Sequence, residues 1–265
     1  MAAGGSTRAP AEQLEWEARL APYAAAAAAG AVALFLASVY PTLAFGGQAR
    51  RASAQLLPID AHPTEFLVGA VLGGLSTLAL GAVLAYLYSA ARYRRPELPT
   101  AALALTLGGA ALAAVSAVVV QAQIIDVAHD FAASRVRTEA RADDLLRDGV
   151  SQTAVALGFA GNLALGFGIF LISLNAMRAG LLSRLMGVLG IVVGVLYVIP
   201  QLRGPEVLQL FWLGALAALF LGRWPGGRGR AWEAGEAIPW PTAAEQRAAL
   251  ERRQEEAEER GADGG

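Results

Sequence analysis

The amino-acid sequence predicts an all-α, polytopic membrane protein with six spanning helices and a polar cytoplasmic tail. Hydrophobic residues make up 55% of the 265 residues and charged residues only 16%, against about a quarter charged residues in a soluble domain. The charges collect in short clusters between long uncharged stretches, and the mean hydropathy is +0.46. This composition excludes a disordered protein, a nucleic-acid-binding protein and almost any water-soluble enzyme. The net charge of -1 indicates no polyanionic partner, so the lipid bilayer is the expected surrounding.

A helix needs about 20 predominantly apolar residues to cross a bilayer, and six uncharged stretches approach or exceed this length. The segment before the first stretch is not positively charged, so it lacks the leader of a signal peptide and the stretch is expected to be retained. The last two stretches are short and are expected to cross with little tilt. The predicted spans lie near 22–44, 66–89, 100–122, 153–175, 185–200 and 207–223.

Arginine placement predicts the orientation of the bundle. Arg92, Arg94 and Arg95 lie in the second connection, and Arg178 and Arg184 lie in the fourth, on the same side as both termini of a six-span chain. Positive charges concentrate on the cytoplasmic side of membrane proteins, so we expect a multi-pass protein of the cell membrane with both termini in the cytoplasm. The expected regions are a cytoplasmic segment with an interfacial helix (1–21, carrying Leu14, Trp16 and Leu20), the six-span domain (22–223) and a cytoplasmic tail (224–265).

Two regions outside the spans are also expected to contain helix. Apolar residues continue at helical spacing past the third span, through Ile124, Ala128 and Phe131, so this helix should project beyond the outer interface before the polar stretch 135–148. The tail opens with Pro and Gly, and a helix-start pattern at 241–245 precedes a strongly charged helix. That charged helix is either solvated or binds a partner.

Small residues recur at four-residue spacing in three of the predicted spans. Such faces let two helix backbones approach closely where lipid provides no hydrophobic drive between helices. We expect them to pack helices within one bundle, with an oligomer interface as the alternative. The expected packing residues are Gly69, Gly73 and Gly81 in the second span, Gly190 and Gly194 in the fifth, and Gly214 and Gly222 in the sixth.

Polar side chains at membrane depth are few. Ionisable residues there usually mark ion or proton paths, and none lies near the centre of a predicted span. Asn162 lies midway along the fourth span, and Gln121 and Gln123 lie at the outer end of the third. An interhelical hydrogen bond is the favoured role of Asn162, and contacts with headgroups or loop backbone are favoured for the two Gln. As the alternative, all three line the pathway of a transporter or channel.

A group of acidic and His residues follows the third span. Asp126, His129 and Asp130 occur at i, i+3 and i+4, which places them on one side of a helix. With His62 of the first outer connection, they offer imidazole and carboxylate ligands to zinc or another divalent ion. Polar residues also gather wherever a helix leaves the bilayer, and we favour this second interpretation. We therefore expect no metal and no cofactor.

Two tryptophans of the tail are expected to dock onto a surface. Trp232 and Trp240 lie in a Gly- and Pro-rich segment, too far from the last span to be simple interface anchors. An exposed Trp beside Pro is unusual unless it docks. The surface is either the cytoplasmic end of the protein's own bundle or a protein partner, and the sequence favours both equally.

The C-terminal third is similar to an uncharacterised family of bacterial multi-pass integral membrane proteins. The segments that carry the resemblance are 175–190, 210–225 and 232–246, of which the Trp-containing last one is the most distinctive. The resemblance implies an integral protein of the cell membrane, and it implies no activity, cofactor or catalytic residue.

Three classes of function are compatible with the sequence. A non-enzymatic accessory or scaffold protein, which engages a partner through its cytoplasmic tail, fits best with an elaborate tail and no membrane-buried charge. A transporter or channel subunit for a small solute or lipid is the alternative. A membrane enzyme using Asp126, His129 and Asp130 ranks last, because no nucleophile or phosphate-binding loop accompanies them. We therefore expect that the protein is not an enzyme.

Overall fold

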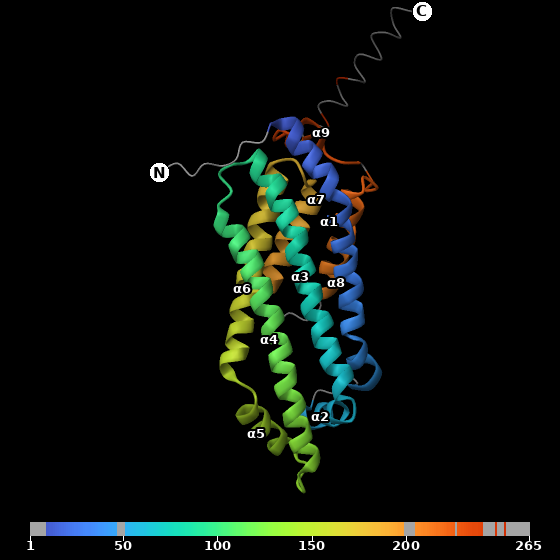
Figure 1. The fold of residues 1–265 in the computed structure, drawn as a ribbon, viewed down its shortest axis with the longest axis vertical. Helices are drawn as coiled ribbons and strands as arrows, with labels where there is room; N and C mark the ends of the chain where they lie inside the picture. Colours follow the sequence, from blue (N-terminus) through green and yellow to red (C-terminus); the bar gives the residue numbers. More distant parts are fainter. Residues whose placement is uncertain are drawn as a thin grey trace, which may run out of the picture.

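The computed structural model describes residues 9–46, 51–198, 205–225, 227–240, 247 and 252, and every regular element within them is helical, as predicted (Figure 1). The chain order is α1 (Pro10–Ser38), the short π-helix η1 (Thr42–Gly46), α2 (Ala52–Ala61), α3 (Pro63–Arg94), α4 (Thr100–Ala133), α5 (Glu139–Gly149), α6 (Gln152–Arg178), α7 (Arg184–Val198), α8 (Pro205–Phe220) and α9 (Ala231–Ala234).

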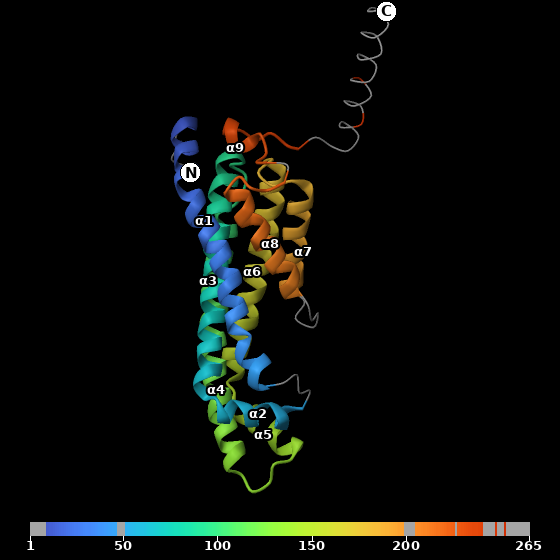
Figure 2. The same cartoon turned by 90° about the vertical axis from the view of Figure 1, so that its right-hand side faces the viewer.

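Among the described residues, four segments are long and apolar enough to cross a membrane: Pro10–Gly46, Pro63–Arg94, Thr100–Ala133 and Gln152–Arg178. The remaining two predicted spans correspond to α7 and α8, which have 15 and 16 residues. At 1.5 Å per residue they are roughly 22–24 Å long, shorter than the hydrocarbon core of about 30 Å. Helix α7 packs on α6, and α8 lies against α7 and α1 (Figure 2).

The N-terminal segment differs from the expectation of a separate interfacial helix. Residues 10–21 form the first turns of α1, which continues through Pro22. The next turns bury Ala24, Ala25 and Ala28 in the main hydrophobic core. Packing on both sides of Pro22 therefore outweighs the backbone hydrogen bond that a proline removes from a helix.

Close contacts between glycines fix how the long helices cross. A Cβ added at Gly161 of α6 would lie 2.6 Å from the Ala113 nitrogen and 2.9 Å from the Gly109 oxygen of α4. The same relation holds between α6 and α7, where a Cβ at Gly166 would lie 2.7 Å from the Gly194 oxygen. Only glycine allows backbones to approach this closely.

The predicted packing residues have different surroundings in the structure. Gly69 and Gly73 face Ser38 of α1, and Gly190 faces Ser173 and Trp212. Gly214 of α8 makes no such contact, since no atom lies within 4 Å of a Cβ built there. The remaining three lie as follows: Gly81 faces Ala110 of α4, Gly194 faces Gly166 and Phe170 of α6, and Gly222 has a φ of +69° just after α8.

A second, smaller core closes the end of the bundle opposite the start of α1. As predicted, the third long helix continues past residue 122 and ends at Ala133. Its last turns pack Val127 and Phe131 against Leu56 of α2 and Ala142 of α5. The polar stretch expected before the fourth span is thus largely helical, and its one buried residue joins this core.

One carboxylate ties the two short helices of this end together. Glu139, the first residue of α5, accepts hydrogen bonds from the backbone nitrogens of Ala52 (2.6 Å) and Ser53 (3.2 Å) and from the Ser53 hydroxyl (2.5 Å). Ala52 and Ser53 are in the first turn of α2, where free N–H groups and the helix dipole favour an anion. The Ser53 hydroxyl, and then the two backbone N–H groups, hold the pKa of Glu139 below its ordinary value of 4.5.

Acid is expected to weaken this end of the protein through Glu139. Because its pKa is lower in the folded chain than in the unfolded one, its stabilisation is present above about pH 4.5 and is lost as the pH falls through the folded pKa. Thermal unfolding in detergent between pH 6 and pH 3 should therefore show a smaller loss of Tm for Glu139→Gln than for the wild type. Asp143→Asn, an exposed change on the same helix, is the control and should behave as the wild type.

Candidate functional site: a strap across one end of the bundle

The tail segment 227–240, called the strap below, lies across one end of the bundle. The start of α1, the end of α3 and the connection between α6 and α7 meet at this end (Figures 1 and 2). The strap contains the single turn of α9 and ends that turn at Gly235, whose φ of +71° suits glycine. The ionic and aromatic contacts below hold it there.

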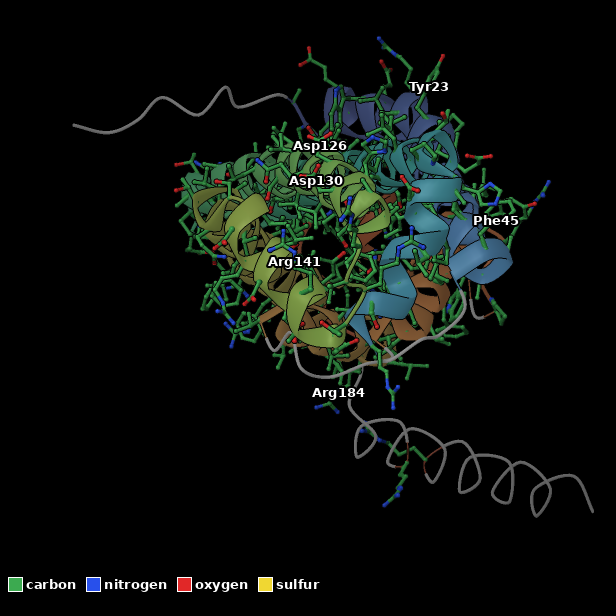
Figure 3. All side chains as sticks on the ribbon, turned by 90° about the horizontal axis from the view of Figure 1, so that it is seen from below. Tyr23, Phe45, Asp126, Asp130, Arg141 and Arg184 are labelled. Carbon is green, nitrogen blue, oxygen red and sulfur yellow. The ribbon has the colours of Figure 1, made fainter. Side chains whose placement is uncertain are left out.

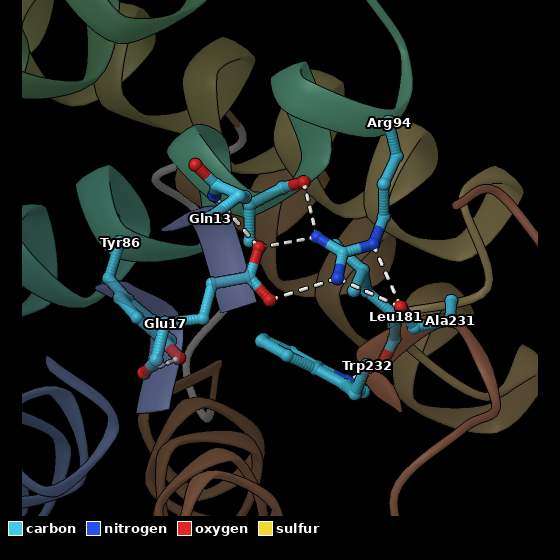
Figure 4. Close-up of polar contacts among 8 residues, drawn as sticks. Gln13, Glu17, Tyr86, Arg94, Leu181, Ala231 and Trp232 are labelled. Carbon is cyan, nitrogen blue, oxygen red and sulfur yellow. Dashed lines mark hydrogen bonds and ion pairs between the residues drawn. The ribbon is translucent and has the colours of Figure 1, made fainter. Parts of the chain in front are cut away.

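A buried ion pair forms the centre of the site (Figure 4). Arg94, the last residue of α3, donates from Nη1 to Glu17 Oε1 at 2.5 Å and from Nη2 to Glu17 Oε2 at 2.9 Å. The side chains of Arg94 and Glu17 are 0% and 3% exposed. This bidentate geometry fits the planar guanidinium to the carboxylate and gives both groups their partners away from water.

The same guanidinium also holds the strap. Its Nε and Nη2 donate to the carbonyl oxygen of Ala231 at 3.0 and 2.8 Å. Gln13 completes the coordination of the carboxylate, donating from Nε2 to Glu17 Oε1 at 2.9 Å. Arg94 therefore connects α1, α3 and the strap through one side chain.

Aromatic rings surround the charged pair. Trp232 of the strap stacks on Tyr86 of α3, with ring centroids 6.1 Å apart, and Tyr86 stacks in turn on Trp16 of α1. Phe220 meets both Tyr86 and Trp232 edge-on. Arg94 and Arg228 lie over the Trp232 ring at 5.7 and 5.8 Å, within the range of a cation–π interaction.

The strap is attached a second time at the turn between α6 and α7. Trp232 donates from Nε1 to the Leu181 oxygen at 2.9 Å, and Trp240 donates from Nε1 to the Gly180 oxygen at 3.1 Å. Ile238 donates from its backbone nitrogen to the Ala179 oxygen. A Cβ at Gly180 would overlap the Ile238 carbonyl, so glycine is required for this close approach as well as for its φ of +81°.

Of the two docking surfaces considered for the tail tryptophans, the structure contains contacts with the protein's own bundle. Trp232 is only 7% exposed and Trp240 is half-buried. Both indole N–H groups are used within the chain. The exposed side of the strap carries Glu233 and Glu236 instead.

The acidic and His residues lie at the opposite end, where all of them except His62 line one cavity. His129 Nδ1 lies 3.2 Å from Asp60 Oδ1, and these two line a cavity of about 290 Å³ with Asp126 and Asp130. Figure 3 shows Asp126 and Asp130 on one side of α4. His62 is directed elsewhere: it stacks on Phe45 at 3.9 Å and pairs with Glu65. Among the described residues, no group of three His, Asp or Glu side chains is arranged to hold a metal ion.

The predicted pathway residues do not share one site. Gln123 accepts a hydrogen bond from the Ser151 backbone nitrogen, which ties the end of α4 to the start of α6. Gln121 has a buried Nε2 without a partner. Asn162 is exposed and lies beside the crossing of Gly161 with Ala113, which is eight residues, or about 12 Å along α4, from Gln121.

The central pair of the site was not foreseen from the sequence. Glu17 reads as one of several acids in a short leader, and Arg94 as one of three arginines that orient the bundle. Residue type alone does not distinguish a buried charge from a solvated one. The available signal was the pair Gln13 and Glu17, which stand one turn apart on the face that continues into the buried alanines of α1.

The fold and the strap define an all-helical membrane protein whose C-terminal segment is clamped over one end of its bundle. The chain belongs to the family described as Domain of unknown function (DUF4386), which matches residues 26–224. The match includes Arg94 and ends before the strap, so Glu17 and Trp232 lie outside it. No curated protein and no solved structure matches the chain.

Proposed function

We propose that this protein is a non-enzymatic accessory or scaffold protein of the cell membrane, which engages a protein partner through the tail beyond its strap. The observation that carries the proposal is the clamp at Arg94, which binds Glu17 of α1 and Ala231 of the strap at once. A strap fixed in this way determines where the tail leaves the bundle. Such a fixed origin is of use when the residues that follow must meet a partner at a defined position.

The proposed topology has six spans with both termini in the cytoplasm. The start of α1 and the strap lie at the same end of the molecule (Figure 2), as an even number of crossings requires. The arginine-rich segments 92–95 and 178–184 lie at the C-terminal ends of α3 and α6 at this end of the molecule, which the positive-inside rule assigns to the cytoplasm. The short α7 and α8 then cross with little tilt or with local thinning of the bilayer.

The proposed partner surface combines the exposed side of the strap with the charged segment after it. Glu233 and Glu236 are exposed, and the segment 241–265 is predicted from its sequence to continue as a charged helix. Trp232 acts in this proposal as the internal anchor of the strap and not as a contact for the partner.

Three of the hydroxyl groups inside the long helices favour this proposal over a transport pathway, although the buried Ser173 hydroxyl of α6 has no hydrogen-bond partner. Ser76 donates to the Ala31 oxygen, Thr106 to the Ala102 oxygen and Ser116 to the Ala154 oxygen, each at 2.6–2.7 Å. These hydroxyls hold the helices together or bond within their own helix. They are therefore committed to the backbone and are not offered to a solute.

Cysteine accessibility tests the proposed topology, and the natural chain provides a clean background because it contains no cysteine. In intact cells, a membrane-impermeant maleimide should label Arg141→Cys of α5 and should not label Glu97→Cys between α3 and α4 until the membrane is opened. For six spans, Arg203→Cys between α7 and α8 should be labelled from outside as well. Labelling of Glu97→Cys in intact cells would contradict the orientation.

A photo-crosslinking amino acid tests the partner surface. Placed at Glu236, it should capture one protein in the native host, and the same adduct should disappear when the chain ends after Trp240, which preserves the strap. The control position is Arg141 on the opposite end, where the adduct should be absent. Equal capture at both positions, or capture that survives the truncation, would contradict a partner site in the tail.

A further inference from the structure

A second cavity, independent of the strap, lies between α1 and α3 near the opposite end of the molecule. Its volume is about 470 Å³, within the range of about 300–1,000 Å³ that small-molecule sites occupy. It lies on two helices of membrane-spanning length, so its surroundings in the bilayer are acyl chains. The residues that line it are Leu36, Ala37, Tyr40, Pro41, Glu65, Val68, Gly69 and Leu72.

The groove exists because α1 ends before it reaches the first turn of α3. The last turn of α1 is reached at Ser38, and the chain then leaves the face of α3 through Pro41 and η1. Gly69 allows the approach at this point, since a Cβ there would lie 2.9 Å from the Ser38 oxygen and 3.2 Å from the Pro41 ring. Where the chain after α1 turns away from α3, Val68 remains 50% exposed, and with Leu36 it forms the apolar walls of the groove.

One end of this apolar groove is polar and negatively charged. Glu65 stands in the first turn of α3 with its side chain 45% exposed. Its Oε1 lies 3.4 Å from His62 Nδ1, which leaves the other oxygen open to an incoming group. Tyr40 is 60% exposed beside it and meets Phe45 edge-on. A carboxylate next to aromatic rings is a combination that attracts ammonium groups.

We propose that this groove is a binding site for a phospholipid with an ammonium headgroup. One acyl chain lies against Leu36, Val68 and Leu72, and the ammonium group pairs with the carboxylate of Glu65 at the membrane surface. Charge selects this class, because an anionic headgroup without an ammonium would meet the carboxylate unfavourably. The groove suits an amphiphile because its apolar walls match an acyl chain and its charged end matches the headgroup.

Native mass spectrometry of the full chain tests the site. The protein is released from nanodiscs of phosphatidylethanolamine or phosphatidylglycerol with identical acyl chains, and the lipids that remain bound are counted. The wild type should retain one phosphatidylethanolamine in preference to phosphatidylglycerol. Glu65→Gln should reduce this preference about fivefold or more, because a charge-assisted hydrogen bond is about twice as strong as a neutral one. Ala37→Phe, which fills the groove from α1, should abolish retention of both lipids.

Two matched variants control for charge and bulk. Glu97→Gln removes an exposed carboxylate at the other end of α3, and Ala26→Phe adds a ring on the exposed face of α1 three turns from the groove. Both should retain phosphatidylethanolamine as the wild type does. Equal retention of the two lipids by the wild type, or unchanged retention in Ala37→Phe, would overturn the proposal. Because Glu65→Gln and Ala37→Phe lie away from the strap, these outcomes are separate from those that test the tail.

Discussion

Replacement of Arg94 by Met is expected to lower the free energy of unfolding by about 3–5 kcal/mol, the usual effect of removing one partner of a buried ion pair. Glu17 would then remain 3% exposed without a counter-charge. The carbonyl oxygen of Ala231 would lose its two hydrogen bonds from the guanidinium in the same step and retain the one from the Gly235 backbone nitrogen. Unfolding in detergent, followed by tryptophan fluorescence during a denaturant titration, measures the change.

A double variant separates the ion pair from general disruption of the site. Glu17→Met combined with Arg94→Met removes both charges and leaves an apolar pair of similar volume, so its stability should return to within about 2 kcal/mol of the wild type. A double variant as unstable as Arg94→Met alone would mean that the charges are not the reason for the loss. The coupling free energy of this cycle is thus the quantity that decides the prediction.

Release of the strap should accompany the loss of Arg94. Trypsin cleaves after arginine, and Arg228 and Arg230 lie next to α9. In the wild type, the contacts of Trp232 and Trp240 with the α6–α7 turn hold this segment against the bundle. Faster cleavage at Arg228 or Arg230 in Arg94→Met, under conditions where the long helices stay intact, would locate the effect in the strap. Unchanged cleavage would show that the contacts with the α6–α7 turn hold the strap without Arg94.

The long helices could be predicted because bilayer thickness sets their length. Uncharged stretches of the sequence correspond to α1, α3, α4 and α6, and continued helical spacing through Phe131 correctly extended α4 beyond its span. The start of α1 was harder to predict, because the predicted first span begins at residue 22, whereas packing continues the helix through Pro22. The small helices α2 and α5 depend on each other, through Glu139 and a shared core. Helix α5 is amphipathic and capped by Thr138, whereas α2 has no comparable local pattern.

The site could be predicted only in part, because its partners are far apart in the chain. The tail tryptophans indicated a docking surface, and the sequence left that surface open between bundle and partner. Arg94 and Glu17 are 77 residues apart, and Arg94 and Ala231 are 137 residues apart. No local spacing rule reaches across such separations, so the clamp needed the fold before it could be recognised. The same holds for Gly161 and Gly109, whose contact is not marked by glycines at four-residue spacing within either helix.

Two neighbouring glycines of α4 are expected to respond in opposite ways to alanine. Gly109→Ala should be destabilising by about 1–3 kcal/mol, the usual cost of overpacking, and toward the upper end of that range. A Cβ at Gly109 would lie 2.6 Å from the Leu165 nitrogen and 2.7 Å from the Gly161 oxygen. Both atoms belong to the backbone of α6, so neither can rotate away as a side chain would. The two helices would have to separate along their whole contact.

Gly108→Ala is the matched control, because it is the same change one residue away. No atom lies within 4 Å of a Cβ built at Gly108, so alanine is expected to be neutral or to stabilise the helix by up to about 1 kcal/mol through its higher helix propensity. Denaturant titration of both variants in the same detergent gives the comparison. Equal effects of the two changes would contradict the α4–α6 crossing at Gly109, since backbone contact at one position and open space at the other is what separates them.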